Sequence, residues 1–153
     1  MHVLELKVPP PVVAVVTAVL MWPVSRSVPA FAFVFPGRNL LAIGLAAAGF
    51  ITAILGIVTF RRAKTTVNPT KPHASSSLVT WGIYAATRNP MYLGLLLMLT
   101  GWALFLSNAL AFLFLPASIL YINRFQIAPE ERALASLFGQ EFVAYKSRVR
   151  RWL

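Results

Sequence analysis

Residues 40–60 read LLAIGLAAAGFITAILGIVTF and contain no charged side chain. A helix of that length rises about 30 Å, which matches the hydrocarbon core of a bilayer. Small residues recur at every fourth position of the stretch: Gly44, Ala48, Thr52 and Gly56. Small residues at this spacing let two helices approach closely in lipid. The stretch therefore predicts a transmembrane helix whose small-residue stripe serves either packing within the chain or dimer formation.

The rest of the chain is also apolar and basic. Its 153 residues are 58% hydrophobic, with a mean hydropathy of +0.72, which is more apolar surface than a soluble domain of this length needs. The 14 Lys and Arg residues outnumber four acidic residues, giving a net charge of +10. Because these bases flank apolar runs, the expected partner is anionic membrane lipid and not nucleic acid.

Three further apolar stretches predict helices. Residues 8–24 contain four prolines and could be an export signal, but no small-residue cleavage site follows, so a retained helix is favoured. Residues 91–106 and 109–123 are separated by Ser107-Asn108, which predicts a helical hairpin. The expected fold is all-α: an integral membrane bundle of about four transmembrane helices.

The charges predict how this multi-pass protein is oriented. The hairpin returns the chain to one side, so the basic residues before it and after it share that side, which the positive-inside rule assigns to the cytoplasm. An even number of spans places the N-terminus there too, while Arg26 and Arg38 lie opposite. Residues 129–153 form an amphipathic pattern broken at Gly139, which predicts a cytoplasmic C-terminal helical tail.

Several classes of site are excluded. The sequence has no glycine-rich phosphate or dinucleotide loop. It has no Cys, and His2 and His73 lack neighbouring ligands, so no metal site is expected. A Ser-His-Asp triad is also excluded, because the chain has no Asp.

A polar cluster is expected at the cytoplasmic edge of the bilayer. Arg88 precedes the hairpin and Glu131 follows it, so similar arm lengths bring the two side chains to one depth. Charges at that depth pair with each other or hold a polar ligand. Simpler explanations are equally open, since Glu130 and Glu131 suit the first turn of a helix and Arg88 could extend to lipid headgroups.

An ordered series of motifs resembles a known family. The sequence is similar to the membrane methyltransferases that include isoprenylcysteine carboxyl methyltransferase and phosphatidylethanolamine methyltransferase. The similarity covers residues 61–153 and is carried by Thr66-Val67-Asn68-Pro69, Leu78-Val79, Gly82-Ile83-Tyr84, Arg88-Asn89-Pro90-Met91-Tyr92-Leu93-Gly94, Glu130-Glu131, Leu134, Phe138-Gly139, Phe142, Tyr145 and Arg148. The chain length suits one membrane domain, residues 1–153, in which N-terminal helices (1–60) precede the methyltransferase-like core with a cofactor-binding tail (61–153) that the resemblance implies.

The resemblance implies S-adenosylmethionine as the cofactor. It assigns Arg88 and Glu131 to catalysis, with Glu131 on the amino or ribose groups of the cofactor and Arg88 on its carboxylate or on an anionic acceptor. The implied cofactor-binding residues are Tyr84, Asn89, Pro90, Tyr92, Gly94, Glu130, Glu131, Tyr145 and Arg148.

One position departs from the family pattern. Asn89 stands where the motif usually has His, and an amide cannot take up a proton near neutral pH. This favours an acceptor that needs no base, such as a carboxylate, whose pKa is about 3.5. A prenylcysteine-like carboxylate, a lipid and a thiol all remain open as lipophilic acceptors.

Two other functions are compatible with the sequence. Membrane sterol reductases are similar in their C-terminal helices and use NADPH, although the paired Glu130 and Glu131 favour the methyltransferase. A non-catalytic protein that binds anionic lipid through its tail is the third hypothesis, and it predicts no cofactor binding.

Overall fold

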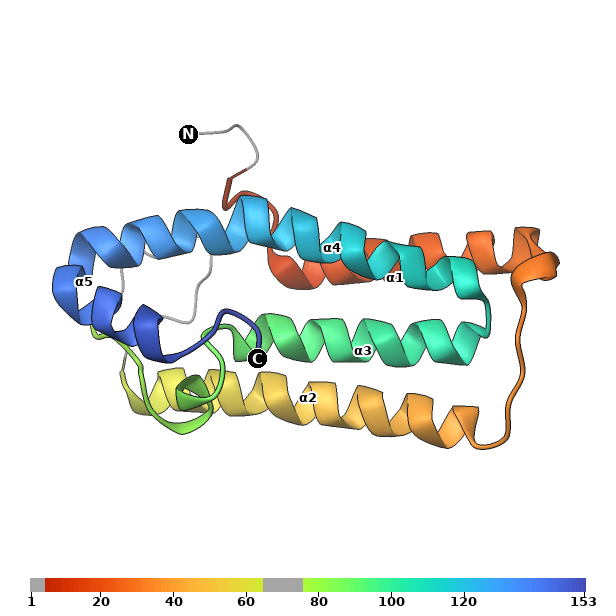
Figure 1. Ribbon diagram of the computed structural model, residues 1–153, viewed down its shortest axis with the longest axis horizontal. Coiled ribbons are helices and arrows are strands. Elements are labelled where there is room, and N and C mark those ends of the chain that lie inside the picture. The colour runs from red at the N-terminus through yellow and green to blue at the C-terminus, as the bar shows by residue number, and fades with distance from the viewer. Residues whose placement is uncertain (1–4, 65–75) are drawn as a thin grey trace.

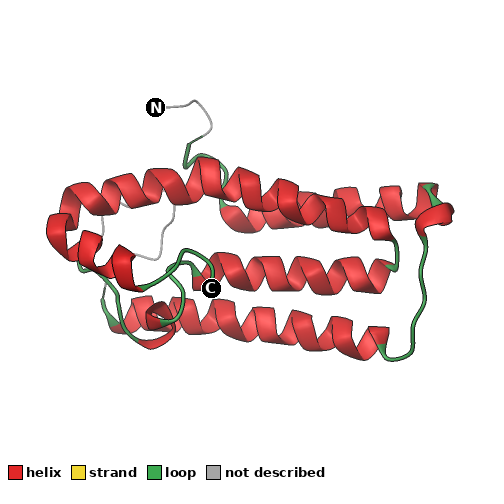
Figure 2. Cartoon of the chain, in the orientation of Figure 1, coloured by secondary structure: helices red, strands yellow, loops and turns green. Residues whose placement is uncertain are grey.

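The computed structural model describes residues 5–64 and 76–153, and helices joined by loops make up this part of the chain (Figures 1 and 2). The all-α prediction is confirmed. The main helices are α1 (Pro10–Ser27), α2 (Arg38–Arg62), α3 (Pro90–Leu106), α4 (Phe114–Ile122) and α5 (Ala128–Arg148). Short 3-10 helices occupy Pro29–Phe31, Gly82–Ala85 and Ala109–Leu113, and a π-helical turn occupies Asn123–Ile127.

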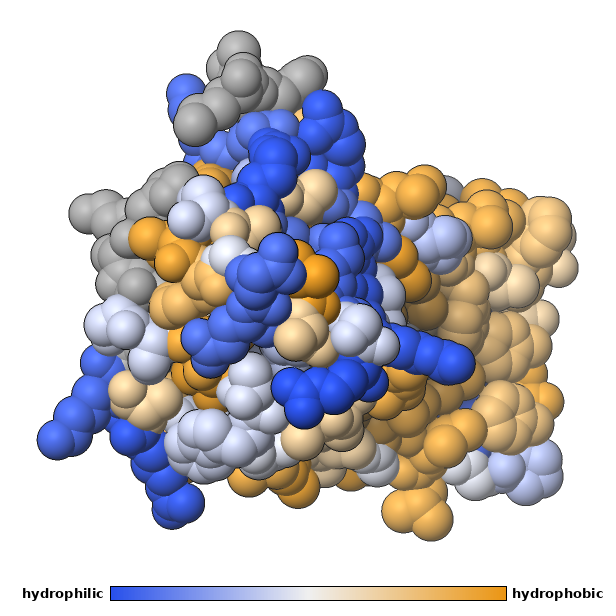
Figure 3. Space-filling model, turned by 60° about the vertical axis from the view of Figure 1, so that its left-hand side comes forward, coloured by the Kyte–Doolittle hydropathy of each residue, from blue (hydrophilic) through white to orange (hydrophobic). Residues whose placement is uncertain are grey.

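Apolar helical segments run side by side along the molecule (Figure 1). Within the described residues, three helical runs are long and apolar enough to cross a membrane: α1, α2 and the run Ala109–Arg148. The fourth, α3, has 17 residues and packs along α2. Hydrophilic residues gather at the end that holds α5 and the C-terminus, whereas apolar side chains cover the helices beyond it (Figure 3). The chain is an integral membrane protein.

Helices α2 and α3 approach so closely that glycine is required at the contact. A Cβ added to Gly94 would lie 2.5 Å from the carbonyl oxygen of Gly49, and one added to Gly101 would lie 2.6 Å from that of Ala42. Gly56 packs against Pro90 and Met91. Ala42, Gly49 and Gly56 recur every seven residues, the period that keeps one face of a helix against a partner.

As a surface for packing within the chain, the predicted small-residue stripe is therefore only partly correct. Gly56 belongs to the contact, but Gly44 and Ala48 are exposed, and a Cβ at Gly44 would meet nothing within 4 Å. An α-helix has 3.6 residues per turn, so residues spaced four apart lie at progressively different angles around the helix axis. Within a few turns such residues no longer face the same neighbouring helix.

The turn between α3 and the next helical segment confirms the predicted hairpin. Ser107 adopts a left-handed conformation with φ of 57°. Asn108 is buried, and its Oδ1 accepts from the backbone N–H of Leu110 at 3.0 Å. Its Nδ2 donates to the carbonyls of Ser25 and Val28 at 3.2 and 2.8 Å. One amide therefore caps the second arm and fastens it to the end of α1.

The second arm of the hairpin does not end near residue 123, as the sequence suggested. It continues through the π-helical turn into α5. Pro129 was expected to start a separate tail helix, but the preceding π-helical turn provides the wider backbone in which its ring fits. The interruption lies at Gly139, with φ of 50°, where a break was expected. Helix α5 turns back on itself (Figure 1), which brings its second half towards the start of α3.

Candidate active site

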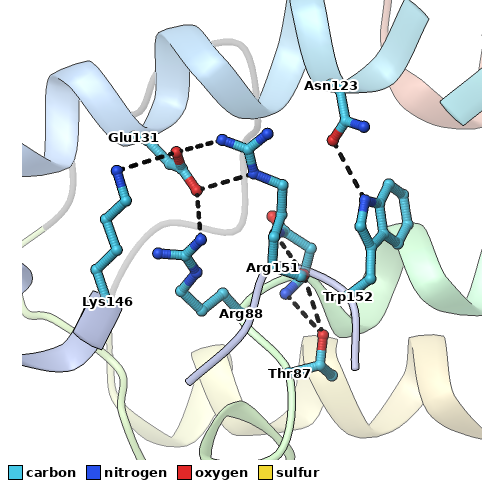
Figure 4. Close-up of polar contacts among 8 residues, drawn as sticks. Thr87, Arg88, Asn123, Glu131, Lys146, Arg151 and Trp152 are labelled. Carbon is cyan, nitrogen blue, oxygen red and sulfur yellow. Dashed lines mark hydrogen bonds and ion pairs between the residues drawn. The ribbon is translucent and has the colours of Figure 1, made fainter. Parts of the chain in front are cut away.

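The loop entering α3 and the first turns of α5 meet at the polar end of the bundle. Arg88 and Glu131 form an ion pair, with 3.1 Å between Nη2 and Oε1 (Figure 4). Their side chains are only 10% and 13% exposed. The two stretches on either side of the hairpin are therefore folded together, as the sequence predicted.

Glu131 also binds two cations from the C-terminal end of the chain. Arg151 donates to it from both Nε and Nη2, at 3.2 and 2.6 Å, and Lys146 Nζ lies 3.9 Å from Oε2 (Figure 4). One carboxylate thus faces three cations. Because positive charge exceeds negative charge within this group, the cluster is suited to attract an anionic ligand.

The backbone of the C-terminal segment, residues 149–153, is fastened to the same loop. The N–H of Arg88 donates to the carbonyl of Arg150 at 3.0 Å. Asn89 Nδ2 and Thr87 Oγ1 donate to the carbonyl of Arg151, at 2.9 and 3.3 Å. The Asn89 amide therefore acts as a hydrogen-bond donor that holds this segment over the site.

Sequence reasoning missed Arg151 and Trp152. Trp152 Nε1 donates to Asn123 Oδ1 at 3.3 Å, so the segment also contacts the π-helical turn (Figure 4). Both residues follow the end of α5, where no helical periodicity constrains which side chains face the bundle. The only available signal was the density of basic residues in this part of the chain.

Three buried tyrosines lie near the Glu130-Glu131 pair. The Tyr92 hydroxyl donates to Glu130 Oε1, and the Tyr145 hydroxyl donates to the carbonyl of Tyr84 at 2.8 Å. Phe60 packs edge-on against the Tyr84 ring, with 4.9 Å between centroids. Burial, with smaller contributions from Tyr145 and Glu130, raises the pKa of Tyr84 well above its usual value. Tyr84 therefore stays a neutral phenol at physiological pH.

Three other predicted residues lie elsewhere. Pro90 is the buried first residue of α3, and Gly94 faces α2. Arg148 is exposed, and its Nε donates to the carbonyl of Ala144 within α5 at 3.2 Å. The structure does not bring Gly94 or Arg148 to the cluster. The motif residues 66–69 lie outside the described part of the chain.

Arg88 has hydrogen-bonding capacity that its described neighbours do not use. Its Nε and Nη1 atoms are buried and have no hydrogen-bond partner among the residues that the structure describes. A buried N–H donor without a partner is unfavourable by about 1–3 kcal/mol, and by more when it belongs to a charged group. Carboxylate or phosphate oxygens are suitable acceptors for these two separately directed N–H groups, so the residues present fit an anionic ligand group.

Comparison with known proteins finds both a similar protein and a matching family. A protein of Haemophilus influenzae described as uncharacterized is 57% identical over 63 residues, which are 41% of this chain and 100% of that protein. Residues 38–141, from the start of α2 into the second half of α5, match the phospholipid methyltransferase family. This match covers more than half of the chain and includes both sides of the Arg88–Glu131 pair. The chain belongs to the phospholipid methyltransferase family.

Proposed function

We propose that this membrane methyltransferase uses S-adenosylmethionine and transfers its methyl group to a lipophilic acceptor at the bilayer surface. The observation that carries the proposal is the buried Arg88 guanidinium, which has two unpartnered N–H-bearing nitrogens beside the carboxylate of Glu131. S-adenosylmethionine carries both a carboxylate and cationic groups, so a site that pairs these two residues offers a complement to each.

When bound, the cofactor supplies an electrophilic methyl group. The residues of this chain would bind and orient it: Arg88 would receive its carboxylate, and Glu131 its amino or ribose groups. Glu131 is already bound by Arg151, so a cationic ligand group must share the carboxylate or displace that side chain. The buried rings of Tyr84, Tyr92 and Tyr145 would exclude water, which favours aligned methyl transfer.

The hydrogen bonds at the site favour an acceptor that is already anionic. The Asn89 amide donates to a backbone carbonyl, and Tyr84 is held as a neutral phenol, so neither residue is arranged to remove a proton. A carboxylate acceptor is ionised at neutral pH without help. A prenylcysteine-like carboxylate fits this chemistry, and an ionised thiol or an anionic lipid fits it as well.

A binding assay tests the cofactor. Purified protein in detergent is titrated with labelled S-adenosylmethionine, and Arg88→Gln and Glu131→Gln are compared with Glu141→Gln, which alters an exposed glutamate on the same helix. Loss of a charge-assisted contact of about 1.5–3 kcal/mol predicts affinity reduced by roughly ten- to a hundredfold in the two site variants. The control should bind like the wild type.

Two results would contradict the proposal. The first is unchanged cofactor affinity in both site variants. The second is saturable binding of NADPH, but not of S-adenosylmethionine, to the wild-type protein, which would favour a reductase. Incorporation of labelled methyl into a lipid extract, followed by mass spectrometry, would identify the acceptor.

A further inference from the structure

The segment that precedes α1 packs against the start of α5. Glu5 has a side chain only 7% exposed and pairs with two arginines: Arg124 Nη1 lies 3.0 Å from its Oε1, and Arg132 Nη2 lies 2.7 Å from its Oε2. Arg124 precedes the Glu130-Glu131 pair and Arg132 follows it. One carboxylate therefore holds both ends of the stretch that carries the acidic residues of the site.

Backbone contacts join the same two segments. The N–H of Leu6 donates to the carbonyl of Phe125 at 3.0 Å. In a regular α-helix the carbonyl of Phe125 would accept from the N–H of residue 129. Here residue 129 is proline, which has no N–H. Gln126 is fully buried, and its Nε2 donates to the carbonyl of Val8 at 2.6 Å. Residues 5–8 therefore contact the π-helical turn at successive positions.

The π-helical turn sets the direction in which the acidic pair points. The N–H of Ala128 donates to the carbonyl of Asn123, five residues back, where an α-helix spans four. The additional residue rotates everything after the turn by about 100° relative to an uninterrupted α-helix. With this rotation Glu130 accepts a hydrogen bond from Tyr92, and Glu131 forms an ion pair with Arg88. Relaxation of the turn to α-helical bonding would rotate both carboxylates away.

We propose that residues 5–8 form an N-terminal strap that holds the π-helical turn and thereby the phase of Glu130 and Glu131, with Glu5 as the positioning residue. The strap lies outside residues 38–141, which match the family. Its predicted effect on ligand binding rests on the proposed function, whereas its effect on the helix does not. The N-terminal strap thus makes a segment that lacks family motifs part of the site.

Three variants test the strap in the full-length protein. Glu5→Gln removes the charge at constant size, Glu5→Asp keeps it, and Glu141→Gln removes an exposed charge elsewhere on α5. We expect Glu5→Gln to speed hydrogen exchange of the backbone amides of residues 127, 128 and 130–133 by about fivefold, the factor for loss of about one hydrogen bond. Glu5→Asp should restore part of the protection, and the control should leave exchange unchanged.

A second measurement separates positioning from general stability. In the wild-type background Glu131→Gln should lower the melting temperature, because it leaves Arg88 buried without its partner. In the Glu5→Gln background the same change should have a smaller effect, because the pair is already misaligned; additive shifts would overturn the proposal. Cofactor affinity of Glu5→Gln should fall by roughly threefold or more.

The outcomes also distinguish the strap from the proposed function. Unchanged amide exchange in Glu5→Gln would refute the strap, whatever the protein binds. Faster exchange and non-additive melting in a protein that does not bind S-adenosylmethionine would support the strap and refute the cofactor assignment. Faster exchange together with unaltered cofactor affinity would reduce the strap to a structural contact and overturn the positioning role.

Discussion

At the scale of single residues, Arg88 has fewer hydrogen-bond acceptors around it than donors, and Glu131 has more cations around it than it can neutralise. Arg88 has five N–H donors, and buried donors on two of its nitrogens have no partner among the described residues. Glu131 has more cations than one carboxylate can neutralise. An ion pair with a purely structural role would leave neither unpartnered arginine donors nor excess cations. The arrangement therefore supports the proposed ligand site, near which the side chains of Tyr84, Tyr92 and Tyr145 are buried.

Asn89 is a residue whose role depends on its contacts. Its position in the motif suggests proton chemistry, because the family usually has His there. In the structure its amide holds the carbonyl of Arg151, so its contribution is to fasten the C-terminal segment beside Glu131. A His side chain also carries an N–H donor, which explains why the two residue types could serve the same contact.

Replacing Asn89 tests this role. Asn89→Ala should loosen residues 149–153 and speed tryptic cleavage after Arg150 and Arg151 by roughly fivefold, as expected for the loss of about 1 kcal/mol. Asn89→His should retain most of the protection, because it can still donate. Asn39→Ala, at an exposed asparagine in α2, is the matched control. Equal cleavage rates in Asn89→Ala and the wild type would show that the amide does not hold the segment.

At the scale of elements, packing of the antiparallel helices α2 and α3 positions the loop that carries Arg88 and Asn89. The contact runs from Ala42 with Gly101, through Gly49 with Gly94, to Gly56 with Pro90. Pro90 begins α3 directly after Arg88 and Asn89. The glycine contact therefore fixes the position of Arg88 and Asn89 along the axis of the bundle. In a membrane, close van der Waals packing is a main source of helix association.

Adding a methyl group to this contact should be destabilising. Gly94→Ala would place a Cβ 2.5 Å from the backbone oxygen of Gly49, so the helices must separate, at a cost of about 1–3 kcal/mol. Gly44→Ala is the control, since a Cβ there meets nothing within 4 Å. Thermal unfolding in detergent should show a lowered midpoint for Gly94→Ala alone. Similar midpoints for the two variants would disprove the close contact.

At the scale of the whole molecule, the described charges are divided between the two ends of the bundle. Arg26 and Arg38 lie at the end opposite the site. The site end holds Lys7, Arg61, Arg62, Lys64, Arg88, Arg124, Arg132, Lys146, Arg148, Arg150 and Arg151. The positive-inside rule predicts that the site end faces the cytoplasm, where the proposed polar cofactor could enter from water and a lipophilic acceptor from the bilayer.

Cysteine labelling tests this orientation, because the chain has no Cys of its own. Val34→Cys lies in the connection between α1 and α2 and is 83% exposed, and Leu153→Cys at the site end is 73% exposed. A membrane-impermeant maleimide should label Val34→Cys in intact cells and Leu153→Cys only after permeabilisation. The reverse pattern would place the site outside.

The sequence by itself determined the membrane location, the hairpin and the meeting of Arg88 with Glu131, because these follow from hydropathy, helix length and the order of segments along the chain. Only the tertiary structure decided that Ala42, Gly49 and Gly56 form the helix contact and that the second arm runs on into α5. It also decided that Arg151 reaches Glu131 and that residues 5–8 contact the π-helical turn. Helix phase and the path of irregular segments depend on contacts between residues distant in the chain, which local periodicity does not encode.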